Sequence, residues 1–241
     1  MNSHRMSTNL NRLANLLKRK GLITQNSWRI LYEVAQSIRA GSEENWELII
    51  TPDNPLQFIK AELDDRVKPD IFCEITASGN EDYPLTHLRL VLRAWSIQEN
   101  LSYRPEWDSE KIMERLKEYY TIDRVISRCH YDNCSVDQYA PYYHFQFHGT
   151  PHVDELYWFP HNVELPHFPS PPIDLILACE VVVATFFPTI YYELLQKGEW
   201  RKLIKESEEF ILKKYYERCK NYLDSSPPDQ TLLDSLCNQP S

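Results

Sequence analysis

Apolar residues recur with helical spacing near the start of the chain. Over residues 9–20, leucines stand three or four positions apart among polar and basic residues, which predicts an amphipathic helix ended by Gly21. A second helix is predicted over residues 27–40, with Asn26 as its N-cap and Gly41 after its last turn. We therefore predict a helical hairpin over residues 7–41. Half of a winged-helix DNA-binding domain has this pattern, but a plain hairpin packed on a sheet is commoner.

From residue 46 the apolar period changes from helical spacing to two. Strands are predicted where apolar and polar residues alternate between Pro, Asn, Asp and Gly, over residues 46–51, 56–63, 70–76 and 85–96. A helix is predicted over residues 108–120, followed by strands over residues 124–132, 142–149 and 155–159. Residues 45–160 are thus interpreted as a sheet with one inserted helix.

The C-terminal third returns to helical spacing. After a proline-rich crossing over residues 166–172, residues 173–187 are apolar nearly all round, which predicts the central buried helix. A last amphipathic helix is predicted over about residues 199–223, so that the C-terminal helices occupy residues 172–224. Residues 225–241 are rich in Ser, Pro and Asp and are expected to form a flexible tail, with a short patch at Leu232, Leu233 and Leu236 that can dock on a partner.

These elements predict the fold class and the domain organisation. We expect a single α+β domain over residues 1–224, built as a meandering antiparallel sheet with helices at both chain ends packed on one face. A chain of 241 residues is long enough for one substantial core, and 42% apolar with 25% charged residues is typical of a soluble globular protein.

Charge and composition exclude several classes of function. The net charge of -9 gives no global electrostatic attraction for nucleic acid, although a local basic patch remains compatible with it. The chain has 5 Gly and no glycine-rich phosphate-binding motif, and we predict no cofactor. The longest apolar run, residues 175–187, is too short to span a bilayer, and polar residues interrupt every N-terminal run that could serve as a signal peptide. Six irregularly spaced cysteines indicate reduced thiols, so we expect a cytoplasmic protein without a membrane partner.

Histidines gather in one stretch of the chain. Six of the eight lie between His130 and His167. The segment 143–148 alternates as a strand does, which places His144, Gln146 and His148 on one face. In a strand His144 and His148 are roughly 13 Å apart, too far to share one metal ion.

A second strand can bring further ligands to the histidines. If residues 124–132 pair antiparallel with residues 142–149, His130 or Asp132 approaches His144 or His148 across the ladder. The alternative is a solvated polar sheet face that binds no metal, which we favour because exposed sheet faces need polar side chains. We therefore predict no metal site in the primary interpretation.

Three further catalytic hypotheses fit the sequence less well. Asp70 and Glu74 begin like the strand of a PD-(D/E)xK nuclease, but no lysine follows before residue 111. Cys129 or Cys134 beside a histidine is conceivable as a nucleophile, yet free cysteines are more often small buried apolar residues. Glu180 is the isolated charge of the apolar helix. It is interpreted either as an acid with a pKa raised by burial, or as the structural partner of an arginine at position 89, 93 or 128.

The segment from residue 129 to residue 188 resembles an uncharacterised bacterial protein family. Its members carry a Pro-x-Tyr-His-x-Gln-Phe-Gly-Gly strand, a Leu-Pro-Arg-x-x-x-Pro-Pro-Met-Asp turn and an apolar helix ending in Asn-Phe. This chain departs from that pattern at His148, His167, Ile173 and Thr185. The resemblance implies kinship and a setting among bacterial mobile-element and antiviral defence genes, and it implies no activity.

Two functional interpretations are open. In the first, the chain is a non-catalytic interaction subunit of a bacterial complex. It binds an anionic partner, either an acidic protein or nucleic acid, through a His/Arg-rich sheet face. The candidate binding residues are Arg89, Arg93, Arg124, Arg128, His130, His144, Gln146, His148 and, at the entry to the apolar helix, Asp174. In the alternative, the chain is a metal-dependent hydrolase or nuclease that uses His130, Asp132, His144 and His148.

Overall fold

The computed structural model describes most of the predicted elements. The described residues are 3–41, 45–59, 61, 70–80, 85–96, 124–133, 143–147, 168–225 and 231–232. The sequence predictions that lie outside them include the helix over residues 108–120, the strand over residues 155–159, the placement of Cys134 and His148, and most of the tail over residues 225–241.

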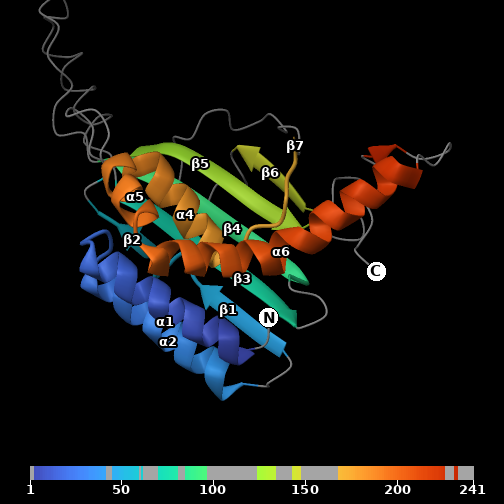
Figure 1. The fold of residues 1–241 in the computed structure, drawn as a ribbon. Helices are drawn as coiled ribbons and strands as arrows, with labels where there is room; N and C mark the ends of the chain where they lie inside the picture. The colour runs from blue at the N-terminus through green and yellow to red at the C-terminus, as the bar shows by residue number, and fades with distance from the viewer. Residues whose placement is uncertain are drawn as a thin grey trace, which may run out of the picture.

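The described elements combine helices and strands as the α+β class requires (Figure 1). The helices are α1 (Ser3–Arg19), α2 (Gln25–Ala40), α4 (Leu175–Phe186), α5 (Pro188–Leu195) and α6 (Gly198–Ser225). The strands are β1 (Asn45–Ile50), β2 (Leu56–Phe58), β3 (Asp70–Asn80), β4 (His87–Ser96), β5 (Arg124–Asn133), β6 (Tyr143–Phe147) and β7 (Phe168–Pro169). The predicted fold class is confirmed.

Seven described strands form one antiparallel sheet in the order β1-β3-β4-β5-β6-β7, with β2 pairing beside β1 along β3. From β3 to β7 each strand pairs with the next along the chain, so this part is the expected meander. Within the predicted strand over residues 56–63, the structure describes β2 (Leu56–Phe58), and Ile59 and Ala61 lie outside it. The two-residue β7, inside the proline-rich crossing, was not predicted.

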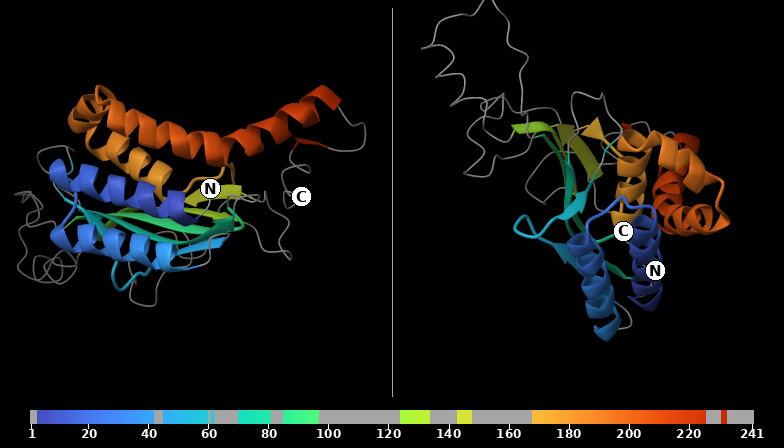
Figure 2. Two further views of the ribbon diagram at one scale, coloured as in Figure 1. Left: turned by 60° about the horizontal axis from the view of Figure 1, so that its bottom comes forward. Right: turned by 90° about the vertical axis from the view of Figure 1, so that its left-hand side faces the viewer.

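One face of the sheet carries the core. Side chains alternate along β1, where Trp46, Leu48 and Ile50 are buried and the three residues that alternate with them are exposed. The register continues this apolar row through β3 and β4 to Tyr131 of β5. In the end-on view of Figure 2 the described helices lie toward this side of the sheet, with the α1–α2 hairpin at the β1–β2 edge. The buried apolar residues of helices and strands form one contiguous cluster.

The hairpin packs on the sheet edge through its linker. Gly21 has φ +66°, its N–H donates to the Lys18 carbonyl and the N–H of Leu22 donates to the Leu17 carbonyl, which together close α1 as a Schellman motif. The N–H of Ile59 then donates to the carbonyl of Leu22 at 2.9 Å, joining the linker to the end of β2. The hairpin thus packs on the sheet, as in the commoner of the two arrangements considered from the sequence.

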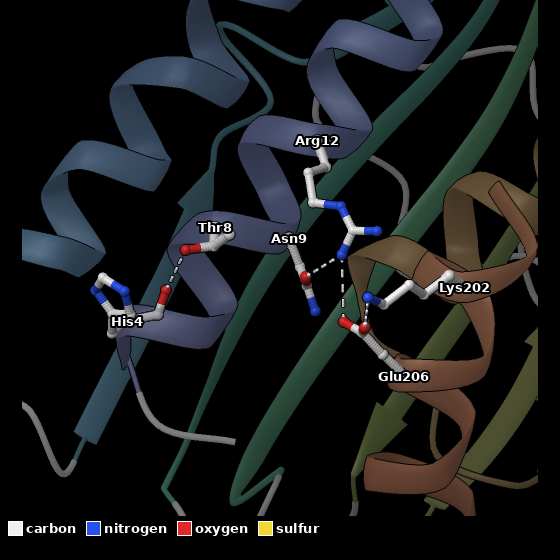
Figure 3. Close-up of polar contacts among 6 residues, drawn as sticks. All are labelled: His4, Thr8, Asn9, Arg12, Lys202 and Glu206. Carbon is white, nitrogen blue, oxygen red and sulfur yellow. Dashed lines mark hydrogen bonds and ion pairs between the residues drawn. The ribbon is translucent and has the colours of Figure 1, made fainter. Parts of the chain in front are cut away.

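A polar contact joins the first and last described helices (Figure 3). Arg12 of α1 donates from Nη1 to Asn9 Oδ1 and to Glu206 Oε2 of α6, both at 3.3 Å. Lys202 lies 3.9 Å from the other carboxylate oxygen of Glu206. The side chains of Arg12 and Glu206 are mostly shielded from solvent, so this ion pair is screened less than a surface pair.

Two helix boundaries differ from the prediction. Thr24, and not Asn26, caps α2, because its Oγ1 accepts the N–H of Ser27 at 3.1 Å while Asn26 donates to Asn54. The apolar run predicted as one helix ends at Phe187, whose φ of -138° is not helical. Pro188 then starts the separate helix α5, as its fixed φ favours a first helical position.

Candidate functional site

The sheet face opposite the core, called the open face from here on, carries most of the predicted binding residues. No described helix lies on it, as the end-on view of Figure 2 shows. Register positions assign β4 residues Arg89, Val91 and Arg93 to this face, because Leu88, Leu90 and Leu92 alternate with them toward the core.

The register of β4, β5 and β6 brings the candidates together in cross-strand rows. Arg89 is opposite Asp132, which is opposite His144. In the next row His130 lies between Val91 and Gln146. The structure thus shows the antiparallel pairing of these two histidine-bearing strands that the sequence analysis considered as a condition for their histidines to approach each other.

A third row places two arginines opposite each other. Arg93 of β4 is the direct partner of Arg128 of β5. Residues directly opposite in an antiparallel pair have Cβ atoms about 4.5–5.5 Å apart, and like charges there destabilise the sheet. This row therefore places two like charges at directly opposite register positions of the open face.

Arg124 does not belong to these rows. The pairing of β4 with β5 shifts between Ala94 and Trp95, and beyond this irregularity Arg124 lies opposite Ser96. A β-bulge adds one residue to one strand, so the residues beyond it change faces relative to the partner strand. The sequence carries no sign of this shift, and the structure separates Arg124 from the Arg93–Arg128 row.

The open face is not uniformly solvated. Arg89 and His87 are exposed, as expected for a polar sheet edge or face. His144, Glu74 and Val91, however, are buried, with 3%, 5% and 3% of their surface exposed. The expectation of a solvated row at His144 is thus corrected, because this imidazole has almost no surface in contact with water.

Asp174 lies in the core and not on a surface. It is 1% exposed and caps α4, where Oδ1 accepts the N–H of Leu177 at 2.9 Å. Its other oxygen accepts the hydroxyl of Ser207 from α6. Burial raises the pKa of Asp174, and these hydrogen bonds counteract part of the rise. The structure therefore gives this predicted binding residue a buried helix-capping position.

Glu180 pairs with a tyrosine from the neighbouring helix. The hydroxyl of Tyr191 in α5 donates to Glu180 Oε1 at 3.0 Å. Burial raises the pKa of Glu180, the bond from Tyr191 lowers it, and nearby Glu208 raises it again. Of the predicted arginine partners, Arg89 belongs to the opposite face of the sheet and does not reach this carboxylate.

The Tyr191→Phe variant tests this assignment. Removing the hydroxyl is expected to raise the pKa of Glu180 further and to cost about 0.5–1.5 kcal/mol at neutral pH. A raised pKa means that stability is fully present below the ordinary value of 4.5 and is lost as pH rises through the folded-state pKa. Carboxyl NMR titration measures the shift. Tyr192→Phe is the control, since Tyr192 is 68% exposed, and an equal shift in both variants contradicts the assignment.

Metal and thiol chemistry find little support among the described side chains. In the part of the chain that the structure describes, no three His, Cys, Asp or Glu residues converge as a metal-binding group. Burial raises the pKa of Cys129 to about 11, so this thiol stays protonated at neutral pH. Asp70, considered as a nuclease carboxylate, accepts a hydrogen bond from Gln57 at 2.8 Å. The proposed metal ligands His130, Asp132, His144 and His148 cannot all be placed, because His148 lies outside the described residues.

Comparison of the chain with family models, with curated proteins and with solved structures finds no match in any of the three. Within the described ranges, no helix has both the length and the apolar character that crossing a membrane requires. The function of the open face is accordingly inferred from its own residues.

Proposed function

We propose that this chain is a non-catalytic interaction subunit that binds an anionic partner, nucleic acid or an acidic protein surface, across the open face of its sheet. The observation that carries the proposal is the register of Arg93 directly opposite Arg128. Like charges at directly opposite register positions destabilise a sheet, and binding of a phosphate or carboxylate there would offset that cost.

Neighbouring cationic positions extend this row along the sheet. Arg89 is exposed on the same face of β4, four residues from Arg93 and therefore about 13 Å away along the strand. His130 lies between them in the next strand, one row from each arginine. This spacing suits a partner with several separated anionic groups better than a single small anion.

The positive charges of the open face attract an anionic partner, whereas the net negative charge of the whole chain repels it. The net charge of -9 repels polyanions at long range, so attraction is confined to the open face. At physiological ionic strength, screening over about 8 Å weakens the distant repulsion more than the contacts at the arginines. Binding is therefore expected to depend on these few residues and not on overall charge.

The resemblance of residues 129–188 to a bacterial family supplies the setting of the proposal. It supports an interaction subunit that works inside a bacterial complex of a mobile-element or antiviral defence system. That segment contains the second half of β5, with β6 and α4.

Binding isotherms test the proposal with two defined probes, a labelled single-stranded oligonucleotide and a labelled polyglutamate peptide. The double variant Arg93→Gln/Arg128→Gln is expected to weaken binding of the preferred probe by roughly tenfold or more, because each charged hydrogen bond contributes about 1.5–3 kcal/mol. The matched control is Lys202→Gln/Lys205→Gln, which removes the same charge from exposed positions of α6 on the other side of the sheet.

Three results contradict the proposal. If the arginine and lysine variants weaken binding equally, binding depends on the net charge of the protein and not on the open face. If the wild-type protein binds neither probe at low salt, the hypothesis of an anionic partner is rejected. Bound metal and hydrolytic turnover, both lost in His144→Ala, support the metal-dependent hydrolase instead.

A further inference from the structure

Positive charge is concentrated in the first two helices. Residues 3–41, which form α1 and α2 with their linker, contain seven of the chain's 26 basic residues and one of its 35 acidic residues. The hairpin is therefore basic, although the whole chain has a net charge of -9. Such an asymmetry within one chain is typical of a surface that binds a polyanion.

Part of this positive charge faces the C-terminal helices. In both views of Figure 2, α1 lies between α2 and α6. Arg12, Arg19 and Lys20 form ion pairs with glutamates of α6 and α5, which neutralise their charge locally. The ion pairs leave the hairpin with positive charge to attract a further anion. Four other basic residues of the hairpin have exposed side chains, namely Arg5, Lys18, Arg29 and Arg39.

A pair of stacked aromatic rings lies where the two helices meet. Lys18 Nζ is 3.8 Å from the centre of the Trp28 ring, and Trp28 Nε1 donates to Asn15 Oδ1 at 3.3 Å. Tyr32 stacks on Trp28, with ring centroids 5.8 Å apart and an interplanar angle of 23°. Trp28 is half-buried and packs against the core, whereas Tyr32 is 46% exposed. The stack is therefore anchored through Trp28 and open to solvent at Tyr32.

A basic side chain continues this line along α2. Tyr32 and Arg39 follow Trp28 by four and eleven residues, so all three lie on one side of the helix. The contacts of Trp28 with Lys18 and Asn15 show that this side of α2 meets α1. Arg39 is about 16 Å from Trp28 along the helix axis. Stacked nucleotides are about 3.4 Å apart, so roughly five of them span this length.

We infer that Lys18, Trp28, Tyr32 and Arg39, together called the hairpin surface, bind single-stranded nucleic acid. A base stacks on the ring of Tyr32, and Lys18 and Arg39 bind phosphates on either side of that base. Stacking favours nucleic acid over an acidic protein segment, because every base has a ring face and acidic side chains have none. A single strand is favoured over a duplex, since its bases are free to leave their own stack. This inference does not depend on anion binding at the open face.

The test measures binding of a short labelled oligothymidine by fluorescence anisotropy. The reference protein is the full chain with Arg93→Gln/Arg128→Gln, so that the hairpin surface is measured apart from the open face. In this reference, Tyr32→Ala is expected to weaken binding by roughly tenfold through the loss of one base–aromatic stack. Tyr32→Phe keeps the ring and should bind as the reference does. The matched control is Tyr192→Ala, which removes a 68% exposed tyrosine of α5 and should leave binding unchanged.

The charged residues are tested through the salt dependence of the same binding. For single strands, each phosphate neutralised contributes about 0.7 to the slope of the logarithm of the binding constant against the logarithm of salt concentration. In the reference protein, Lys18→Gln/Arg39→Gln should therefore reduce this slope by about 1.4. Lys202→Gln/Lys205→Gln removes the same charge from α6 and should leave the slope unchanged.

Three results overturn the inference. If wild type binds oligothymidine and the reference protein does not, the open face accounts for all binding. If Tyr32→Ala binds as tightly as Tyr32→Phe, no base stacks on this ring. If a polyglutamate peptide binds the reference protein, and binds Tyr32→Ala equally well while oligothymidine binds neither, the occupant of the hairpin surface is an acidic protein segment.

Discussion

Replacing Asp174 with alanine is expected to lower the free energy of unfolding by about 2–4 kcal/mol. The variant loses the cap of α4, which contributes about 0.5–2 kcal/mol. It also leaves the buried hydroxyl of Ser207 without its acceptor, at a further cost of about 1–3 kcal/mol. Urea unfolding measures the difference. A loss below about 0.5 kcal/mol, the level of an ordinary surface substitution, contradicts the capping role.

Asp174→Asn is the matched control, because asparagine caps helices as well as aspartate does. Its amide can donate to Ser207, whose hydroxyl turns to accept. Since burial raises the pKa of Asp174 above 3.8, the wild-type carboxyl group stabilises the fold most at low pH and loses that contribution as pH rises through the folded-state pKa. The asparagine variant should therefore gain stability relative to wild type as pH rises from 3.8 through the folded-state pKa of Asp174.

Replacing Trp200 with alanine is expected to cost about 3–5 kcal/mol, the range for removing a large buried aromatic side chain. Trp200 is fully buried at the start of α6, in the cluster that joins this helix to the rest of the core. The loss should appear as a lower urea midpoint. A cost below about 1 kcal/mol means that the surrounding residues close the cavity, and it contradicts a fixed packing of α6.

The variant Trp200→Phe distinguishes the effect of lost side-chain volume from the effect of removing the polar indole N–H. The indole Nε1 of Trp200 is buried without a hydrogen-bond partner among the described residues. Because an unsatisfied buried donor costs about 1–3 kcal/mol, removing it offsets part of the volume lost. Phenylalanine is thus expected to retain most of the stability that alanine loses.

Much of the fold could be predicted from the period of apolar residues. Alternation of Leu88, Leu90 and Leu92 identified β4 and its core face, and three- and four-residue spacing identified α1 and α6. These elements are recognised because the side that they bury is set by their own sequence. Alternation also identified the two segments that form β5 and β6, while their pairing was considered only as a possibility and is shown by the register.

Details that depend on distant residues were not predictable. The partner of Asp174 is Ser207, 33 residues away, and neither position has a sequence signal for the other. Thr24 replaced Asn26 as a cap because Asn26 bonds with Asn54, 28 residues later. In each case the tertiary contact selects among several residues with equal local propensity.

The sequence predicted which strands form the candidate site, but it did not predict which of the site's side chains are exposed to solvent. Alternation placed His144 on the face opposite Phe145, and the register confirms that position. It did not reveal that His144 is buried, because alternation distinguishes the two faces of a strand without showing what covers either face. Val91, the apolar exception among the polar open-face positions of β4, was the available signal, since a buried valine there indicates a partly covered face.

The salt dependence of oligonucleotide binding tests the proposed function most directly. For single strands, the logarithm of the binding constant falls with the logarithm of salt concentration by about 0.7 for each phosphate neutralised. If Arg93 and Arg128 each bind a phosphate, Arg93→Gln/Arg128→Gln should reduce this slope by about 1.4, while Lys202→Gln/Lys205→Gln leaves it unchanged. A slope in the arginine variant equal to that of the wild type would contradict anion binding at the open face.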